Sequence, residues 1–155
     1  EAGCDPRRPG PGDLMLAVND AVIAAQNAVV AAESLGLGSC YIGDIMERYE
    51  EHRRLLALPE WVFPACMLVM GYPTRQQRER KKAARFEQRF IVQENAYCRL
   101  EGTRLREMYR GHTGAQSFED FLAAFCRRKY ESDFSREMSR SVGQYLKDFQ
   151  GEAEV

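Results

Sequence analysis

The stretch that decides the fold runs from Asn19 to Gly43, NDAVIAAQNAVVAAESLGLGSCYIG. Its first part has the composition of a long apolar helix, which we expect to start after Asn19 or Asp20 because both are good N-cap residues. A Gly-x-Gly break follows, and Gly36 stands where a left-handed residue commonly ends a helix. The chain then continues through a short extended segment that ends at Gly43-Asp44.

Within this helix, polar residues recur every seven positions and form one stripe on an otherwise apolar rod. The stripe consists of Asn19, Asp20, Gln26, Asn27, Glu33 and Ser34. Most of the circumference of such a helix must be buried, and a chain of 155 residues offers a limited core for it. We therefore expect the helix to lie at the interface of a homodimer, with burial in the core of one chain as the alternative.

The composition excludes several classes of function. A net charge of -1 gives no overall attraction to nucleic acid, and we find neither a signal peptide nor an uninterrupted apolar run of membrane-spanning length. Five cysteines without a C-x-x-C pair favour reduced thiols in a cytoplasmic protein with no metal site. His52 and His112 lie far apart in the sequence. A catalytic Cys–His pair stays open as a minor alternative.

The remaining pattern predicts a helix-rich chain with few strands. A nearly all-apolar run is expected to form a central strand buried on both faces. Two strands alone do not make a stable sheet, and the chain begins with Glu1, so we expect it to be the C-terminal part of a longer protein. The expected elements are a loop at 1–13, helices at about 45–56, 117–130 and 134–149, a strand at 65–70 and a short strand or extended arm at 89–94.

The order and spacing of the motifs resemble the nitroreductase family of FMN enzymes. The matching pieces are D-A-x-I-A-A-Q-N-A-x-x-A-A-E-S-L-G-L-G-x-C-Y-I-G at 20–43, L-L-x-L-P at 55–59, V-M-G-Y-P at 69–73, Arg85, and I-V-Q-E-N-x-Y at 91–97. The resemblance implies an α+β fold, a central sheet flanked by helices, from which the family's N-terminal part is absent. It implies a single domain over 1–155, with a core at 14–97 and a helical extension at 98–155.

The resemblance also implies a function. Family members are FMN-dependent oxidoreductases. In them, NAD(P)H reduces the flavin by hydride transfer and leaves, and an electron-poor acceptor then binds where NAD(P)H was bound. This is a ping-pong scheme, with nitroaromatics or quinones as acceptors. It needs no side chain as general acid or base, so we expect no catalytic residue. The alternatives are a flavin-binding protein without turnover and a helical dimerisation module.

Six residues are the expected cofactor-binding positions. The resemblance places Tyr41, Ile42, Gly43 and Asp44 against the flavin ring, with backbone N–H groups as fixed donors. We expect the Asp44 carboxylate to point away from the ring and to cap a helix that starts at Ile45. Without the resemblance, this segment would be an ordinary helix–loop–helix corner.

The resemblance assigns Arg85 to the FMN phosphate. The lysine that usually accompanies it would fall at Ala83, so Lys82 or its neighbour Lys81 must take that role. A solvated charged face is the alternative for this basic segment. The family's N-terminal part normally supplies further phosphate contacts, so we expect the site in this chain to be incomplete. Relatives often have His where this chain has Gln93.

Overall fold

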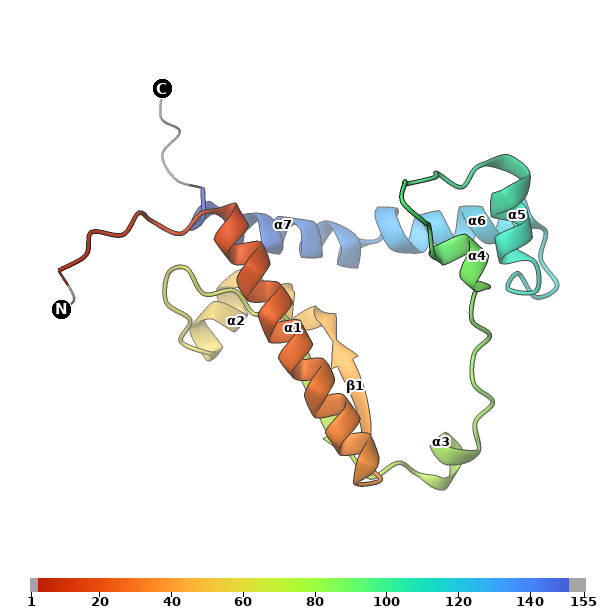
Figure 1. Cartoon of the computed structure of the whole chain (residues 1–155), viewed down its shortest axis with the longest axis horizontal. Helices are drawn as coiled ribbons and strands as arrows, with labels where there is room; N and C mark the ends of the chain where they lie inside the picture. Colours follow the sequence, from red (N-terminus) through yellow and green to blue (C-terminus); the bar gives the residue numbers. More distant parts are fainter. Residues whose placement is uncertain (1–2, 151–155) are drawn as a thin grey trace. The chain divides into compact units, whose positions relative to one another are not determined.

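The computed structural model of this chain describes residues 3–150 and is helix-rich α+β with one small sheet, as the sequence predicts (Figure 1). The chain forms two compact units: unit 1 comprises residues 1–78 and 133–155, and unit 2 comprises residues 79–132. The elements in chain order are α1 Pro11–Ser34, β1 Gly38–Ile42, η1 Gly43–Met46, α2 Tyr49–Leu55, β2 Met67–Gly71, α3 Arg75–Glu79, α4 Gln88–Ile91, α5 Gly102–Tyr109, α6 Phe118–Cys126, η2 Arg127–Glu131 and α7 Asp133–Lys147.

Helix α1 starts at Pro11, two turns earlier than the expected cap at Asn19 or Asp20. Pro11 suits the first position of a helix because its missing N–H would have no partner there. The Asp13 carboxylate accepts a hydrogen bond from the Gly10 N–H at 2.8 Å and favours the positive end of the helix dipole. The last residues of the expected loop at 1–13 are therefore helical.

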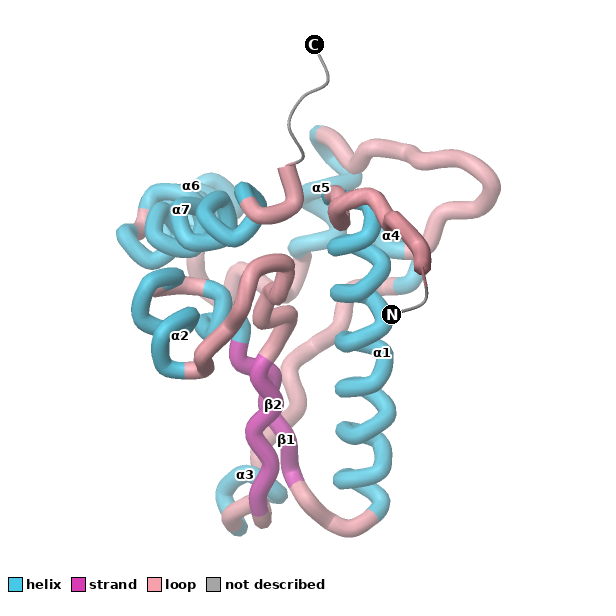
Figure 2. The backbone as a smooth tube through the Cα atoms, turned by 90° about the vertical axis from the view of Figure 1, so that its left-hand side faces the viewer, coloured by secondary structure: helices cyan, strands magenta, loops and turns pink. Residues whose placement is uncertain are grey.

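The end of α1 has the predicted left-handed residue. Gly36 has φ +74°, and its N–H donates to the Glu33 carbonyl at 3.0 Å. The Leu37 N–H donates to the Ala32 carbonyl at 2.9 Å, which completes a Schellman ending. This ending turns the chain directly into β1, so α1 and β1 run side by side (Figures 1 and 2).

Strands β1 and β2 pair antiparallel, with Cys40 opposite Val69 and Ile42 opposite Met67. They are the only two strands in the described residues 3–150. The prediction of a β2 buried on both faces is wrong for this chain, because Met67, Val69 and Met70 all expose 40% or more of their surface. The described part of the chain contains no third strand or helix that covers these side chains on both faces.

The expected helix at 45–56 is interrupted. A 3-10 turn, η1, comes first, and α2 begins only at Tyr49. The break lies at Arg48, which has a left-handed backbone (φ 53°) that a continuous helix cannot contain. Helix α7 matches the predicted C-terminal helix and packs against both η1 and α2.

The core of unit 1 lies where α7 meets α2. Tyr145 is fully buried, and its ring makes edge contacts with Tyr49 at 4.6 Å and Phe63 at 5.4 Å. Burial raises the pKa of its hydroxyl. Arg53 of α2 pairs with Asp148 at 2.7 Å, with both side chains about four-fifths covered. This contact fixes α2 to the residue that directly follows α7.

Unit 2 corrects a further expectation. The segment 89–94 is not a strand: it contains the single helical turn α4, with Phe90 as its buried residue. Helix α6 starts as predicted, because the Ser117 hydroxyl accepts from the Asp120 N–H at 3.1 Å. Around Tyr109, the rings of Phe86, His112, Phe118 and Phe121 form an aromatic cluster.

Helix α1 is mostly uncovered in the single chain, which contradicts the alternative of burial in the core of one chain and leaves the expected dimer interface a prediction. Only Leu14 and Ala32 of the helix are buried. By length and composition, α1 is also long and apolar enough to cross a membrane, with a mean hydropathy of 1.5. The polar residues of the stripe interrupt the apolar run of α1, so a search for an uninterrupted apolar run did not find this helix.

Candidate functional site

The predicted ring segment, residues 41–44, crosses from β1 into η1. Tyr41 and Ile42 are the last residues of β1, opposite Leu68 and Met67. The Tyr41 hydroxyl donates a hydrogen bond to Gln26 Oε1 at 3.2 Å, which ties the strand to the polar stripe of α1. Gln26 therefore has a specific role: it holds the strand end that leads into the segment.

The backbone of this segment is open to a ligand. The N–H groups in the first turn of a helix have no acceptor within the helix. Among residues 3–150, no loop, cap or side-chain hydrogen bond uses the N–H of Gly43 or Asp44. A Cβ added at Gly43 would meet nothing closer than Met46 Cε at 3.9 Å. The structure thus presents two neighbouring backbone donors on an accessible corner.

Asp44 does not cap a helix, contrary to expectation. It lies inside η1, where its carbonyl accepts a hydrogen bond from the Glu47 N–H at 3.1 Å. The expected helix at Ile45 does not begin there, so no helix start needs the Asp44 carboxylate. The α2 start is four residues further on and is capped by other groups.

Those groups come from α7. The Glu137 carboxylate accepts from the Arg48 N–H at 3.1 Å, and the Ser141 hydroxyl accepts from the Tyr49 N–H at 2.9 Å. Arg48 is the N-cap residue of α2, but its own side chain does not cap the helix. Two residues about ninety positions away in the sequence therefore do what a local Ser or Asp usually does.

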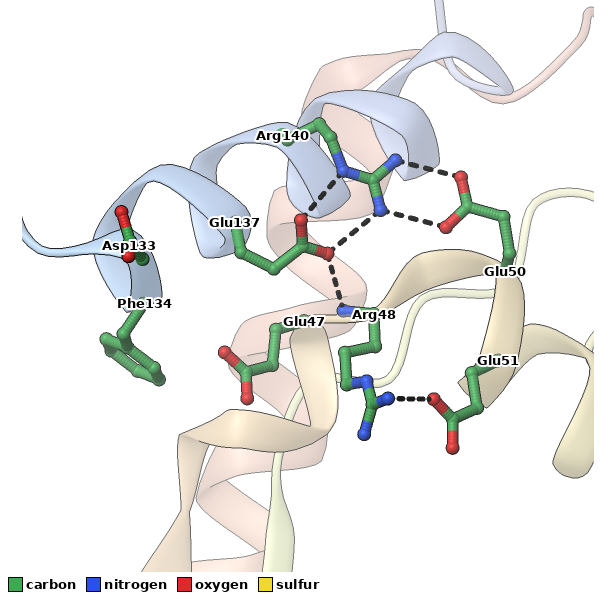
Figure 3. A pocket seen from close by; sticks show the side chains of 8 residues that line it. All are labelled: Glu47, Arg48, Glu50, Glu51, Asp133, Phe134, Glu137 and Arg140. Atoms are coloured by element: carbon green, nitrogen blue, oxygen red, sulfur yellow. Dashed lines mark hydrogen bonds and ion pairs between the residues drawn. The ribbon is translucent and has the colours of Figure 1, made fainter.

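One arginine holds this cap in place. Arg140 donates two hydrogen bonds to Glu50 at 2.8 Å each, and two more to Glu137 at 2.8 and 2.9 Å (Figure 3). The bond from Arg140, followed by the one from Ser141, lowers the pKa of Glu137 to about 2. The bond from Arg140 also lowers the pKa of Glu50 to about 2. Both carboxylates consequently stay ionised above mildly acidic pH.

The predicted phosphate residues belong to unit 2. Lys82 and Arg85 are exposed in the loop before α4, and among residues 3–150 neither has an ion pair. Arg85 lines a cavity of about 250 Å³ together with Arg110 and His112. Nearby Arg89 is already neutralised by Glu87 at 2.8 Å and Glu107 at 2.9 Å. Among residues 3–150, Arg85 and Arg110 are thus the guanidinium groups on this cavity that have no ion pair and can bind an added anion.

Two sets of residues, each taken within its own unit, fit the chemistry of one part of FMN. The backbone N–H groups at 43–44, which make no loop, cap or side-chain hydrogen bond among residues 3–150, suit the electron-rich edge of a flavin ring, since the reduced ring gains negative charge. Arg85 suits a phosphate because its planar guanidinium can donate two parallel hydrogen bonds. The four residues 41–44 are adjacent in unit 1, whereas Lys82 and Arg85 lie in unit 2.

Sequence reasoning missed the residues that hold the segment. Glu137, Arg140 and Ser141 lie on one face of α7, and His52 Nδ1–H of α2 donates to the Ile45 carbonyl at 3.0 Å. Their spacing of three and four along α7 is a signal for a shared face. Nothing in the sequence indicates that this face meets the start of α2.

The fold and the segment 41–44 define a class of protein: an α+β protein in which a helix, a strand and a turn, α1, β1 and η1, form a corner that suits a flavin. Residues 1–72 match the model of the Nitroreductase family. The chain is 30% identical over 137 residues to the FMN reductase (NADPH) of Bacillus subtilis, a match that covers 80% of this chain and 55% of that protein. It is 40% identical over 88 residues to the oxygen-insensitive NADPH nitroreductase of Salmonella typhimurium, which covers 57% of this chain and 35% of that protein.

Solved structures agree with these matches. The NfrA1 nitroreductase of B. subtilis superposes with a TM-score of 0.60 at 28% identity, over 84% of this chain and 58% of that one. A Bacteroides fragilis protein superposes with a TM-score of 0.80 over 96% of this chain and 63% of that one; at 22% identity it shows the fold alone. Residues 1–72 thus have the sequence pattern of the nitroreductase family, and the chain resembles solved nitroreductase structures over most of its length. It spans from about a third to about half the length of the curated relatives it matches.

Proposed function

We propose that this chain acts in an FMN-dependent oxidoreductase that uses NAD(P)H to reduce electron-poor small molecules such as nitroaromatics or quinones. The observation that carries the proposal is the pair of backbone N–H groups at Gly43 and Asp44, which make no loop, cap or side-chain hydrogen bond among residues 3–150, in a chain whose residues 1–72 match the nitroreductase family. Relatives named as an FMN reductase and as an NADPH nitroreductase support the choice of cofactor and reductant.

The chain's own residues have binding and orienting roles. FMN, when bound, supplies the ring that takes hydride from NAD(P)H and passes electrons to the acceptor. The N–H groups of Gly43 and Asp44 donate to the ring edge, and Tyr41 and Ile42 fix that corner on the sheet. Arg85 binds the phosphate bidentately, and Lys82 adds a point charge.

No side chain of this chain is assigned a proton-transfer step. Reductant and acceptor then use one open site in turn, which is a ping-pong scheme. We place the protein in the cytoplasm and expect a homodimer through α1. The long match of a solved structure, over 96% of this chain, includes α1 in the fold, which favours a packed helix over a membrane span.

Initial-rate kinetics test this proposal. The full chain is supplied with FMN, and oxidation of NAD(P)H is followed at several fixed concentrations of a quinone or nitroaromatic acceptor. We expect turnover with parallel double-reciprocal plots, which are the pattern of a ping-pong reaction. Intersecting lines would refute the ping-pong scheme, and no turnover in a chain that binds FMN would refute the oxidoreductase.

The second candidate is a flavin-binding protein without turnover. It is favoured by the extent of the matches, since the chain spans 55% of its B. subtilis relative. In that case bound flavin keeps its visible absorption when NAD(P)H is added without oxygen. Bleaching of the absorption supports the enzyme instead.

A further inference from the structure

The residues that cap α2 lie next to the proposed ring segment and outside it. Only Ile45, Met46 and Glu47 separate the donors at 43–44 from the N-cap Arg48. Helix α7 therefore holds the chain directly after the corner that presents the donors.

The backbone at this point needs outside support. Arg48 has φ 53°, a left-handed conformation that is strained for a non-glycine residue. Helix α2 has only seven residues, too few for a helix that is stable on its own. The bond from His52 Nδ1–H to the Ile45 carbonyl, at 3.0 Å, ties η1 to α2 locally, but it leaves the N–H groups of Arg48 and Tyr49 without a local acceptor.

Helix α7 supplies that support through a buried group. Ser141 is fully buried, accepts from the Tyr49 N–H at 2.9 Å and donates to Glu137 at 2.8 Å. Glu137 in turn accepts from the Arg48 N–H, and Arg140 fixes its carboxylate (Figure 3). The Ser141 hydroxyl and the Glu137 carboxylate are thus hydrogen-bonded to each other. Together they orient the N–H groups of Arg48 and Tyr49.

We propose that Glu137 and Ser141 are positioning residues for the flavin edge: by capping α2 from α7, they fix η1 and so hold the N–H groups of Gly43 and Asp44 in place. This inference rests on the proposed function. The other end of the corner is fixed independently, by the pairing of β1 with β2 and by the bond from Tyr41 to Gln26. Loss of the cap therefore loosens the corner from one side only.

Hydrogen–deuterium exchange of the flavin-free full chain tests the structural step. In Ser141→Ala we expect exchange in the peptide that covers 41–49 to rise roughly fivefold, the factor that matches the usual effect of losing a helix cap. Glu137→Ala should act similarly. Glu137→Gln keeps an acceptor oxygen and should have a smaller effect.

Ser139→Ala is the matched control, because Ser139 is exposed on the same helix. We expect it to leave the exchange of 41–49 unchanged. Unchanged exchange in Ser141→Ala would overturn the proposal, as would an equal rise throughout α1 and β2, which would show general destabilisation. If Ser141→Ala does not fold, the two Glu137 variants decide the outcome by the same criteria.

The midpoint potential of bound FMN tests the functional step. Less ordered donors stabilise the anionic reduced ring less well, so Ser141→Ala should shift the potential to more negative values than Ser139→Ala. Equal potentials would refute the positioning role. A wild-type chain that binds no FMN would instead refute the proposed function, while the exchange result would still decide whether α7 fixes residues 41–44.

Discussion

Gln93 has a structural role that its position in the sequence does not reveal. Its side-chain amide donates to the Cys98 carbonyl at 2.6 Å and accepts from the Cys98 N–H. An amide presents its donor and acceptor side by side, so it can bind both backbone groups of one residue. The family resemblance marks this position as a departure, and the structure explains the glutamine as a clamp on the loop 93–98.

Arg140 is the residue whose charge the capping network depends on. Glu137 and Glu50 each have a pKa lowered from 4.5 to about 2 by their hydrogen bonds with it. A lowered carboxylate pKa in the folded state means that the stabilisation is fully present above about pH 4.5. It is lost as the pH falls toward 2, because protonation breaks the charged hydrogen bonds.

Thermal denaturation between pH 6 and pH 2 measures this effect, with the pH values chosen to span roughly the range of the two titrations. We expect the wild-type melting temperature to fall more steeply below pH 4.5 than that of Arg140→Gln. Arg136→Gln is the control, since the ion pair of Arg136 among residues 3–150 is with the fully exposed Asp133, at 3.6 Å. Parallel curves for wild type and Arg140→Gln would contradict the assignment.

Among the elements, those with strong local signals were predictable. The Schellman ending of α1 follows from Gly36, and the start of α6 follows from Ser117. The start of α1 was misplaced because Pro11 and Asp13 form an earlier cap than Asn19. The break at Arg48 was not predictable, because its stabilising partner Glu137 lies 89 residues away.

Helix α1 carries a line of apolar residues that nothing in the described chain covers. Leu16, Ile23 and Val30 recur every seven residues and are 67%, 61% and 59% exposed. One such line, repeated over several turns, is the pattern of a helix that packs against another surface. It supports the proposed homodimer.

Sedimentation analysis of Ile23→Glu tests that interface. A charge placed on a buried apolar line is costly unless it is paired, so dimer affinity should fall at least about tenfold. Asn27→Glu places the same charge on the polar stripe and should leave the dimer intact. A wild-type monomer, or an Ile23→Glu dimer of wild-type affinity, would contradict this use of α1.

At the scale of the whole molecule, the fold class and family followed from the order of motifs, and the matches confirmed both. The segment 41–44 could be located in advance because glycines and a strand end mark it. The division into two units could not, because it depends on contacts across long sequence separations. The six proposed cofactor residues stay a prediction.

Binding of FMN to the purified full chain, followed by quenching of flavin fluorescence, tests the central claim most directly. We predict saturable binding to one site per chain, weakened about tenfold or more in Arg85→Gln, since hydrogen bonds to charged groups are worth about 1.5–3 kcal/mol. Arg80→Gln removes the same charge from the same basic segment and should bind FMN like wild type. A folded wild-type chain without saturable binding, or equal affinity in Arg85→Gln and wild type, would contradict the account.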